Sequence, residues 1–159
     1  MLILGILKKK GLTKFLAHFN GANGETVFTD SSGNNVPITT VGTAQLSTSI
    51  AALGSSSLYL PANTAYVTVP ATTANFAGKD FCIECRVYPI TKGGFGNIIG
   101  HSIATTSYVG FNLQWEYGTN KIRFLAGYSG GGGIWAIDAT SAIDVLLNAW
   151  SHIAITRQG

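Results

Sequence analysis

Three glutamates are the first candidates for chemistry in this chain of 159 residues. Two carboxylates can act as general acid and general base on a glycosidic bond when they flank it. Glu25, Glu84 and Glu116 lie far apart in the sequence, and no strand-like stretch carries two carboxylates at alternate positions. Glu84 and Glu116 could still meet across a sheet, but ordinary cross-strand ion pairs with Arg86 and Arg123 are the simpler interpretation. The sequence therefore predicts a protein that is not an enzyme.

The cysteines and histidines do not change that prediction. Cys82 and Cys85 form a C-x-x-C pair, but residues three apart in a strand point to opposite faces. They are therefore poorly placed to bond each other or to share a metal, and no second cysteine pair completes a zinc site. His18, His101 and His152 lie on separate predicted elements. We expect no metal site and no cofactor from these residues.

Two alternating stretches are expected to form the centre of the sheet that positions the polar side chains. Residues 81–89 (FCIECRVYP) and 150–157 (WSHIAITR) alternate with a period of two, which is typical of strands with one buried face. Pro89 ends the first stretch, because proline cannot donate to a sheet ladder. We expect these two strands to pair. The alternation predicts a core of Phe81, Ile83, Cys85, Val87, Phe111, Leu113, Trp115, Phe124, Ile153 and Ile155.

The rest of the sequence indicates an all-β fold. Only 11% of the residues are charged, 46% are hydrophobic and 20 are glycines, and turn-forming residues recur along the chain. About eleven short strands are expected, separated by turns every 8–12 residues, as in a sandwich or jelly roll. Residues 108–117 and 121–128 are predicted to form a hairpin. A Thr/Ser-rich link and a single helical turn over residues 142–147 precede the final strand.

One polar sheet face is the predicted ligand-binding site. Side chains on the non-core faces of three or four strands could lie together on one sheet face. They would provide amides, charged groups and an aromatic ring for binding. The alternative is a merely hydrated face, or one that a neighbouring subunit covers. The candidate ligand-binding residues are Glu84, Arg86, Tyr88, Asn112, Gln114, Glu116, Arg123 and His152.

The first fourteen residues differ in charge from the rest of the chain. Lys8, Lys9, Lys10 and Lys14 account for the formal charge of +3, because the other 145 residues carry six basic and seven acidic side chains. Residues 1–14 are therefore predicted to be a basic, apolar N-terminal arm, and residues 15–159 to be the domain. The lysines could contact an acidic surface or increase solubility, and we expect no nucleic-acid partner.

The apolar stretch at the start of the arm is far shorter than the roughly 20 residues of a membrane span. Its charges follow the apolar residues rather than precede them, so we expect neither a signal peptide nor membrane insertion. We expect instead that the arm is an assembly device whose deletion leaves the domain folded. The residues assigned to it are Met1, Leu2, Ile3, Leu4, Ile6, Leu7, Lys8, Lys9 and Lys10.

Four segments in order resemble one known family. HFNGANGETVFTDSSGN (18–34), GSSSLYL (54–60), DFCIECRVYP (80–89) and NAWSHIAITR (148–157) are similar to the concanavalin A-like, laminin-G-like jelly roll. The closest similarity is to the form found in bacteriophage structural and tail-associated proteins. The resemblance implies a two-sheet antiparallel β-sandwich, with the last strand followed by a return strand beyond Gly159.

The resemblance also implies a function. It points to a non-enzymatic structural or attachment module of a bacteriophage virion, such as a tail fibre, spike or decoration protein, made in the host cytoplasm. Its partners would be other virion proteins, copies of itself and a host-surface glycan. The first alternative is a carbohydrate-binding module for host glycan recognition, and a glycan-cleaving enzyme is a distant one. Relatives often have Asp where Asn20 stands, a residue that can help to hold a structural calcium, so calcium is doubtful here although Asp30 remains.

Overall fold

The computed structural model describes residues 2–8, 12–74, 76, 79–91, 95–102, 110–116, 118–127 and 136–158, with the backbone alone at 2–8, 12, 95 and 102. This part of the chain is built almost entirely of antiparallel strands, so the predicted all-β fold class is confirmed. The elements are β1 (Leu2–Lys8), β2 (Leu12–Ala17), β3 (Thr39–Val41), β4 (Gln45–Ser47), β5 (Ser57–Tyr59), β6 (Tyr66–Thr68), η1 (Ala71–Ala74), β7 (Phe81–Val87), β8 (Phe95–Ser102), β9 (Gly110–Glu116), β10 (Lys121–Ala126), β11 (Ile137–Asp144) and β12 (Ser151–Arg157).

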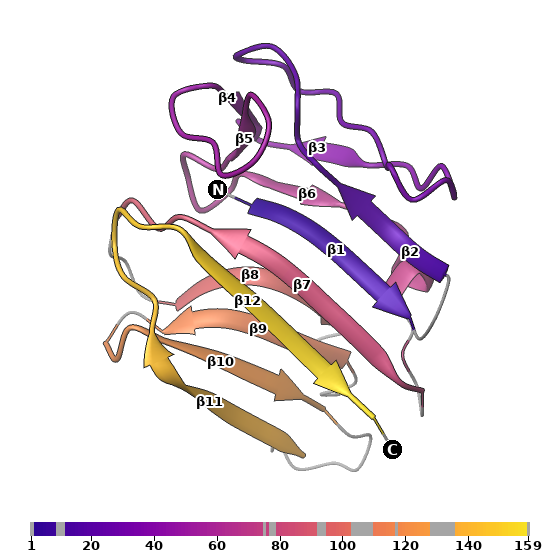
Figure 1. Cartoon of the computed structure of the whole chain (residues 1–159), viewed down its shortest axis with the longest axis vertical. Coiled ribbons are helices and arrows are strands. Elements are labelled where there is room, and N and C mark those ends of the chain that lie inside the picture. The colour runs from indigo at the N-terminus through magenta and orange to yellow at the C-terminus, as the bar shows by residue number, and fades with distance from the viewer. Residues whose placement is uncertain are drawn as a thin grey trace. The chain divides into compact units, whose positions relative to one another are not determined.

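The chain divides into two compact units, which are described separately. The first comprises residues 1–88 and 150–159, and the second comprises residues 89–149. In the first unit, one sheet has the strand order β12-β7-β1-β5-β4, with β2 also paired to β1, and a second small sheet pairs β3 with β6 (Figure 1). In the second unit, a sheet has the order β11-β10-β9-β8.

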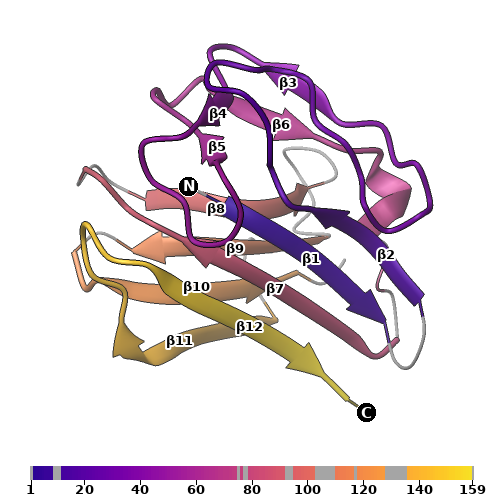
Figure 2. The ribbon, with the colours of Figure 1, turned by 45° about the horizontal axis from the view of Figure 1, so that its top comes forward.

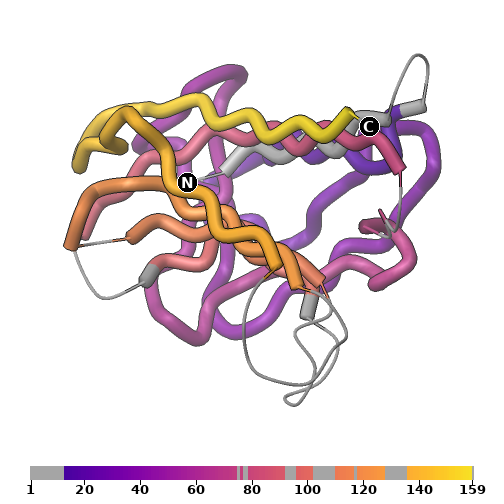
Figure 3. Tube along the Cα trace, turned by 90° about the horizontal axis from the view of Figure 1, so that it is seen from below, coloured from indigo at the N-terminus to yellow at the C-terminus, as the bar shows by residue number. Residues whose placement is uncertain are grey.

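The strand β7 is the centre of the first unit, as its alternation predicts. Ile83, Cys85 and Val87 are buried, whereas the residues between them are half-buried. The predicted pairing with β12 is confirmed, because Ile153 lies opposite Cys85 and the two strands run side by side in the Cα trace (Figure 3). The buried faces of β7 and β12 therefore coincide.

The N-terminal segment differs from the arm that the sequence predicts. Residues 2–8 form β1, which pairs antiparallel with β7 on one side and with β2 on the other (Figure 2). Gly5, for example, lies opposite Glu84 and opposite Leu16. A continuous apolar run of this length is typical of a strand inside a sheet. The expected boundary after residue 14 falls inside β2, and Met1, Lys9 and Lys10 lie outside the described residues.

The hairpin predicted in the second unit is confirmed, but the segment after it is different. In β9 and β10, Trp115 lies opposite Ile122 and Leu113 opposite Phe124. Residues 137–144, expected to be a link and the start of a helical turn, form the strand β11. Most of its residues are exposed, so β11 lacks the alternation that marks a half-buried strand.

Most of the predicted core is buried. The buried members are Ile83, Cys85, Val87, Phe111, Leu113, Trp115 and Ile153, and the half-buried members are Phe81, Phe124 and Ile155. The core also includes buried apolar residues that the prediction omitted, among them Phe15, Leu46, Leu58, Ile122 and Leu125.

Candidate functional site

The structure divides the eight predicted ligand-binding residues between two sheets. Glu84, Arg86 and Tyr88 come from β7 and its end, and His152 comes from β12, all in the first unit. The other four lie in the second unit, so the eight residues do not share one sheet face. Alternation shows which side chains of a strand point together, but it does not show which strands pair. The residues of the second unit are Asn112, Gln114 and Glu116 on β9 and Arg123 on β10.

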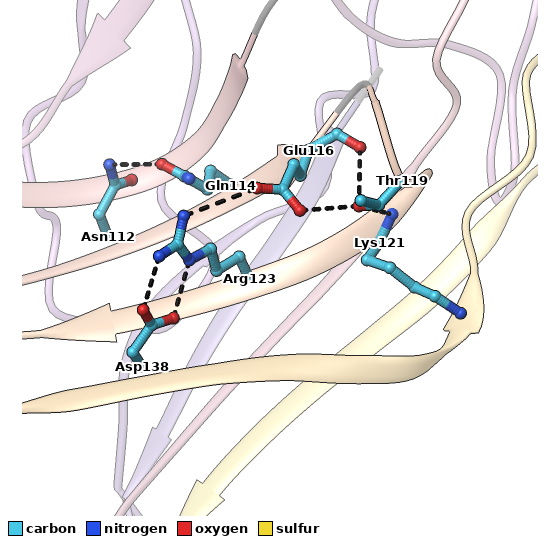
Figure 4. A network of polar contacts seen from close by, with 7 residues as sticks. All are labelled: Asn112, Gln114, Glu116, Thr119, Lys121, Arg123 and Asp138. Carbon is cyan, nitrogen blue, oxygen red and sulfur yellow. Dashed lines mark hydrogen bonds and ion pairs between the residues drawn. The ribbon is translucent and has the colours of Figure 1, made fainter.

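The charged groups described in the second unit pair with one another (Figure 4). Arg123 Nε donates to Asp138 Oδ1 at 2.7 Å, and a second guanidinium nitrogen, Nη2, donates to Oδ2. Hydrogen bonds from Arg123 hold the pKa of Asp138 below its ordinary value of 3.8. Arg123 Nη1 also lies 3.6 Å from Glu116 Oε1, which confirms the expected cross-strand pair. This cluster therefore ties β9, β10 and β11 together.

The amides beside this cluster are also largely engaged with each other. Asn112 Nδ2 donates to Asn97 Oδ1 at 3.1 Å and to Gln114 Oε1 at 3.3 Å. Gln114 is only 7% exposed, and Asn112 Oδ1 is buried without a hydrogen-bond partner among the described residues. Little of this amide surface is open to a ligand. We interpret the polar face of β8–β11 as structural.

The face of the first unit is more accessible. We call it the β7–β12 face and define it by Cys82, Glu84, Arg86, Tyr88, Trp150 and His152. These six residues occupy the positions that alternate with the buried side of the two strands. The side chains of Glu84 and His152 are 42% and 50% exposed.

An aromatic pair lies at one end of the β7–β12 face. The rings of Tyr88 and Trp150 are 5.4 Å apart between centroids and inclined at 62°. Trp150 was not among the predicted site residues, although its position two residues before His152 places it on the same side of the strand. Such rings offer apolar surface, and each also carries a polar atom.

Glu84 contacts two other residues of this face, the thiol of Cys82 and the imidazole of His152. Its Oε1 accepts a hydrogen bond from Cys82 Sγ at 3.6 Å, and its Oε2 lies 4.0 Å from His152 Nε2. Burial, the charge of Glu84 and this hydrogen bond together raise the pKa of Cys82. A nucleophilic cysteine needs the opposite shift, because the thiolate is its reactive form.

The C-x-x-C pair behaves as two separate thiols. Cys82 is half-buried on the β7–β12 face, whereas Cys85 is buried in the core, and both are free. Burial raises the pKa of Cys85 to about 12. The prediction that the two cysteines face opposite sides is confirmed.

The two glutamates that could have formed an acid and base pair belong to different sheets. Glu84 is on β7 and Glu116 is on β9, so they are not cross-strand neighbours. Glu116 accepts a hydrogen bond from Thr119 Oγ1 at 2.7 Å and pairs with Arg123. The described hydrogen bonds and ion pairs of Glu84 and Glu116 include no second carboxylate.

The residues that could have held calcium do not fit such a site. Asp30 is only 7% exposed, and its Oδ1 accepts hydrogen bonds from the backbone N–H groups of Leu16 and Ser32 at 3.0 and 2.9 Å. Its Oδ2 accepts from Ser32 Oγ at 2.7 Å and from Val36 N–H at 3.0 Å. Calcium requires 6–8 oxygen ligands, and both oxygens of this carboxylate are already engaged. Asp30 instead anchors the loop that follows β2.

Replacing Asp30 with Asn is expected to lower the free energy of unfolding at neutral pH by about 1–3 kcal/mol, because one of the two carboxylate oxygens that accept from partly buried donors becomes an NH2 group. Burial raises the pKa of Asp30, but the hydrogen bonds from Val36, Ser32 and Leu16 outweigh it and the pKa lies below 3.8. The stabilisation is therefore present above the ordinary pKa and is lost as the pH falls through the folded-state pKa. Urea titrations of the wild type and of Asp30→Asn between pH 7 and pH 3 measure the difference in their free energies of unfolding. A difference that stays constant over this range would contradict the assignment.

The other two histidines have local contacts. His18 Nδ1 lies 3.1 Å from Ser31 Oγ, and the ring of His101 stacks on Phe111 with centroids 6.3 Å apart. Within the described residues, no cluster of three or more His, Cys, Asp or Glu side chains could hold a metal ion. No helix in that part of the chain is long and apolar enough to cross a bilayer.

One comparison with known proteins places the chain in a family. A family model described as the concanavalin A-like lectin/glucanases superfamily matches residues 61–159, which is more than half of the chain. The matched region includes both strands of the β7–β12 face. No curated protein and no solved structure matches the chain. The chain belongs to the concanavalin A-like lectin/glucanases superfamily.

Proposed function

We propose that this protein is a non-enzymatic attachment module that binds a glycan on its β7–β12 face. The observation that supports this most directly is the aromatic pair of Tyr88 and Trp150 on the same half-exposed face as Glu84, Arg86 and His152. Binding sites for small ligands combine apolar and aromatic surface with a few placed polar groups. A sugar ring offers the complementary surface, with C–H groups over its face and hydroxyls around its rim.

The contacts of the acidic residues support a binding role rather than a catalytic one. Glu84 is engaged with a thiol and an imidazole, and Glu116 with a hydroxyl and a guanidinium. Hydrolysis of a glycoside by the usual route requires two carboxyl groups on either side of the bond. The raised pKa of Cys82 also argues against a nucleophilic thiol.

The proposed setting is a bacteriophage particle, in which this module would bind a host-surface glycan. This part of the proposal is supported by the resemblance of four sequence segments to phage tail-associated proteins, within a superfamily to which the chain belongs. Its other partners would be neighbouring virion proteins and copies of itself. A purely structural role in the particle is the alternative, in which a neighbour would cover the β7–β12 face.

A glycan array probed with the wild-type protein and with Trp150→Ala tests the proposed function. We expect the wild type to bind a defined set of glycans and Trp150→Ala to bind them at least about tenfold more weakly, because aromatic anchors commonly dominate binding. Tyr66→Ala is the matched control, since Tyr66 is an exposed aromatic residue on β6 of the same unit. The absence of binding to every glycan, or equal binding by Trp150→Ala, would contradict the proposal.

A further inference from the structure

We infer that the glycan bound on the β7–β12 face is acidic and that Arg86 binds its anionic group. This inference rests on the proposed function and narrows it to one ligand class, sugars that carry a carboxylate or a sulfate. The argument comes from the position and partial burial of Arg86 and from the contrast between its surroundings and those of Lys121 and Arg123.

Arg86 is placed on the face by the alternation of β7. Its neighbours Cys85 and Val87 are buried, so its own side chain points to the side that carries Glu84 and Tyr88. The register places Arg86 directly opposite His152. Along this side of β7, Arg86 is therefore the residue between Glu84 and Tyr88, and Tyr88 belongs to the aromatic pair.

The charge of Arg86 is not balanced by its described neighbours. Arg86 is half-buried, yet its side chain makes no hydrogen bond or ion pair with any described residue. The nearest carboxylate along the strand, that of Glu84, is directed toward Cys82 and His152. In the second unit, by contrast, Lys121 pairs with Asp144 and Arg123 pairs with Asp138 and Glu116.

A partly buried charge without a partner is costly, and a guanidinium is best satisfied by a planar anion that accepts two parallel hydrogen bonds. Arg is suited to this role because its donors form a rigid fork that matches carboxylate-like groups. The residue opposite it, His152, contributes an imidazole rather than a carboxylate. The face thus combines aromatic surface for a sugar ring with an anion-binding group next to it.

Matched pairs of glycans test the inference on the wild-type protein. The probes are sialyllactose and lactose, oligogalacturonate and its carboxyl-reduced form, and 3-sulfogalactose and galactose. We expect the acidic member of at least one pair to bind about tenfold or more tightly than its neutral partner, with an affinity that falls as salt is added. Equal binding of acidic and neutral members would overturn this inference while leaving the proposed function intact, whereas no binding to any glycan would overturn both.

Substitutions then assign the effect to Arg86. Arg86→Gln is expected to abolish the preference for the acidic glycan over its neutral partner, measured as the ratio of the two affinities in the same variant. Arg86→Lys should recover only part of the difference, because it keeps the charge but loses the fork. Arg157→Gln is the matched control, since it removes the same charge from an exposed site on the other side of β12, opposite Phe81. If Arg86→Gln still binds the acidic glycan more tightly than the neutral one, Arg86 is not the group that binds the anion.

Discussion

Removal of residues 1–10 is expected to unfold the first unit rather than leave it intact. The strand β1 lies between β7 on one side and β2 and β5 on the other, and β2 has no other strand partner among the described residues. Without β1, the β12–β7 pair and the β5–β4 pair lose their connection. The freed edges would present unpaired backbone groups and promote aggregation.

Circular dichroism and urea unfolding of the truncated protein measure this outcome. The outcome expected from the pairing of β1 differs from the one that the sequence predicts, in which deletion of the arm leaves the domain folded. A truncated protein that keeps a cooperative transition and the wild-type midpoint would show that β1 is dispensable to the sheet.

A single substitution in β1 provides a sharper form of the same test. Gly5 pairs with strands on both sides, so Gly5→Pro removes a backbone donor within the sheet and is expected to cost about 3 kcal/mol or more. Gly5→Ala keeps the N–H group and serves as the control for the loss of glycine. Equal stability of the Pro and Ala variants would be inconsistent with a paired position.

Truncation of Phe111 to Ala is expected to lower the free energy of unfolding by about 3–5 kcal/mol, as for other large-to-small changes in a core. Phe111 is 6% exposed on β9, and its ring lies 6.2 Å from that of Phe124 and 6.3 Å from that of His101, between centroids. The substitution removes this buried aromatic surface and leaves a cavity. Urea titration at constant pH measures the change.

The control for this truncation is Ile143→Ala on β11. Ile143 is 80% exposed, so its truncation is expected to change stability by no more than about 0.5 kcal/mol. A loss of less than about 1 kcal/mol for Phe111→Ala would place Phe111 at the surface and shift the register of β9 by one residue.

The two proposals for the β7–β12 face depend on different groups. Glycan binding as such depends on Tyr88 and Trp150, whereas selection of an acidic sugar depends on Arg86. Trp150→Ala is therefore expected to weaken binding of every ligand, whereas Arg86→Gln is expected to remove the preference for acidic over neutral ligands. This separation allows one set of binding measurements to overturn the selection of acidic sugars while leaving glycan binding supported.

The sequence by itself determined the elements whose pattern is local. The alternation of residues 81–87 and 151–157 predicted β7, β12 and their buried faces, because side chains in a strand alternate whatever the partner is. The hairpin of β9 and β10 followed from two strands around a short turn. The separation of Cys82 from Cys85 followed from the same period of two.

The tertiary structure decided which strands share a sheet. Alternation in β7 is the same whether its neighbour is β1 or β9, so the sequence could not show that Glu84 and Glu116 belong to different sheets. The apolar run of residues 2–8 has no alternation. Its place beside β7 depends on pairing with residues that are far away in the sequence. The exposed strand β11 likewise has no periodic signal, because its position comes from its pairing with β10 and from the ion pairs of Asp138 and Asp144 rather than from a buried face.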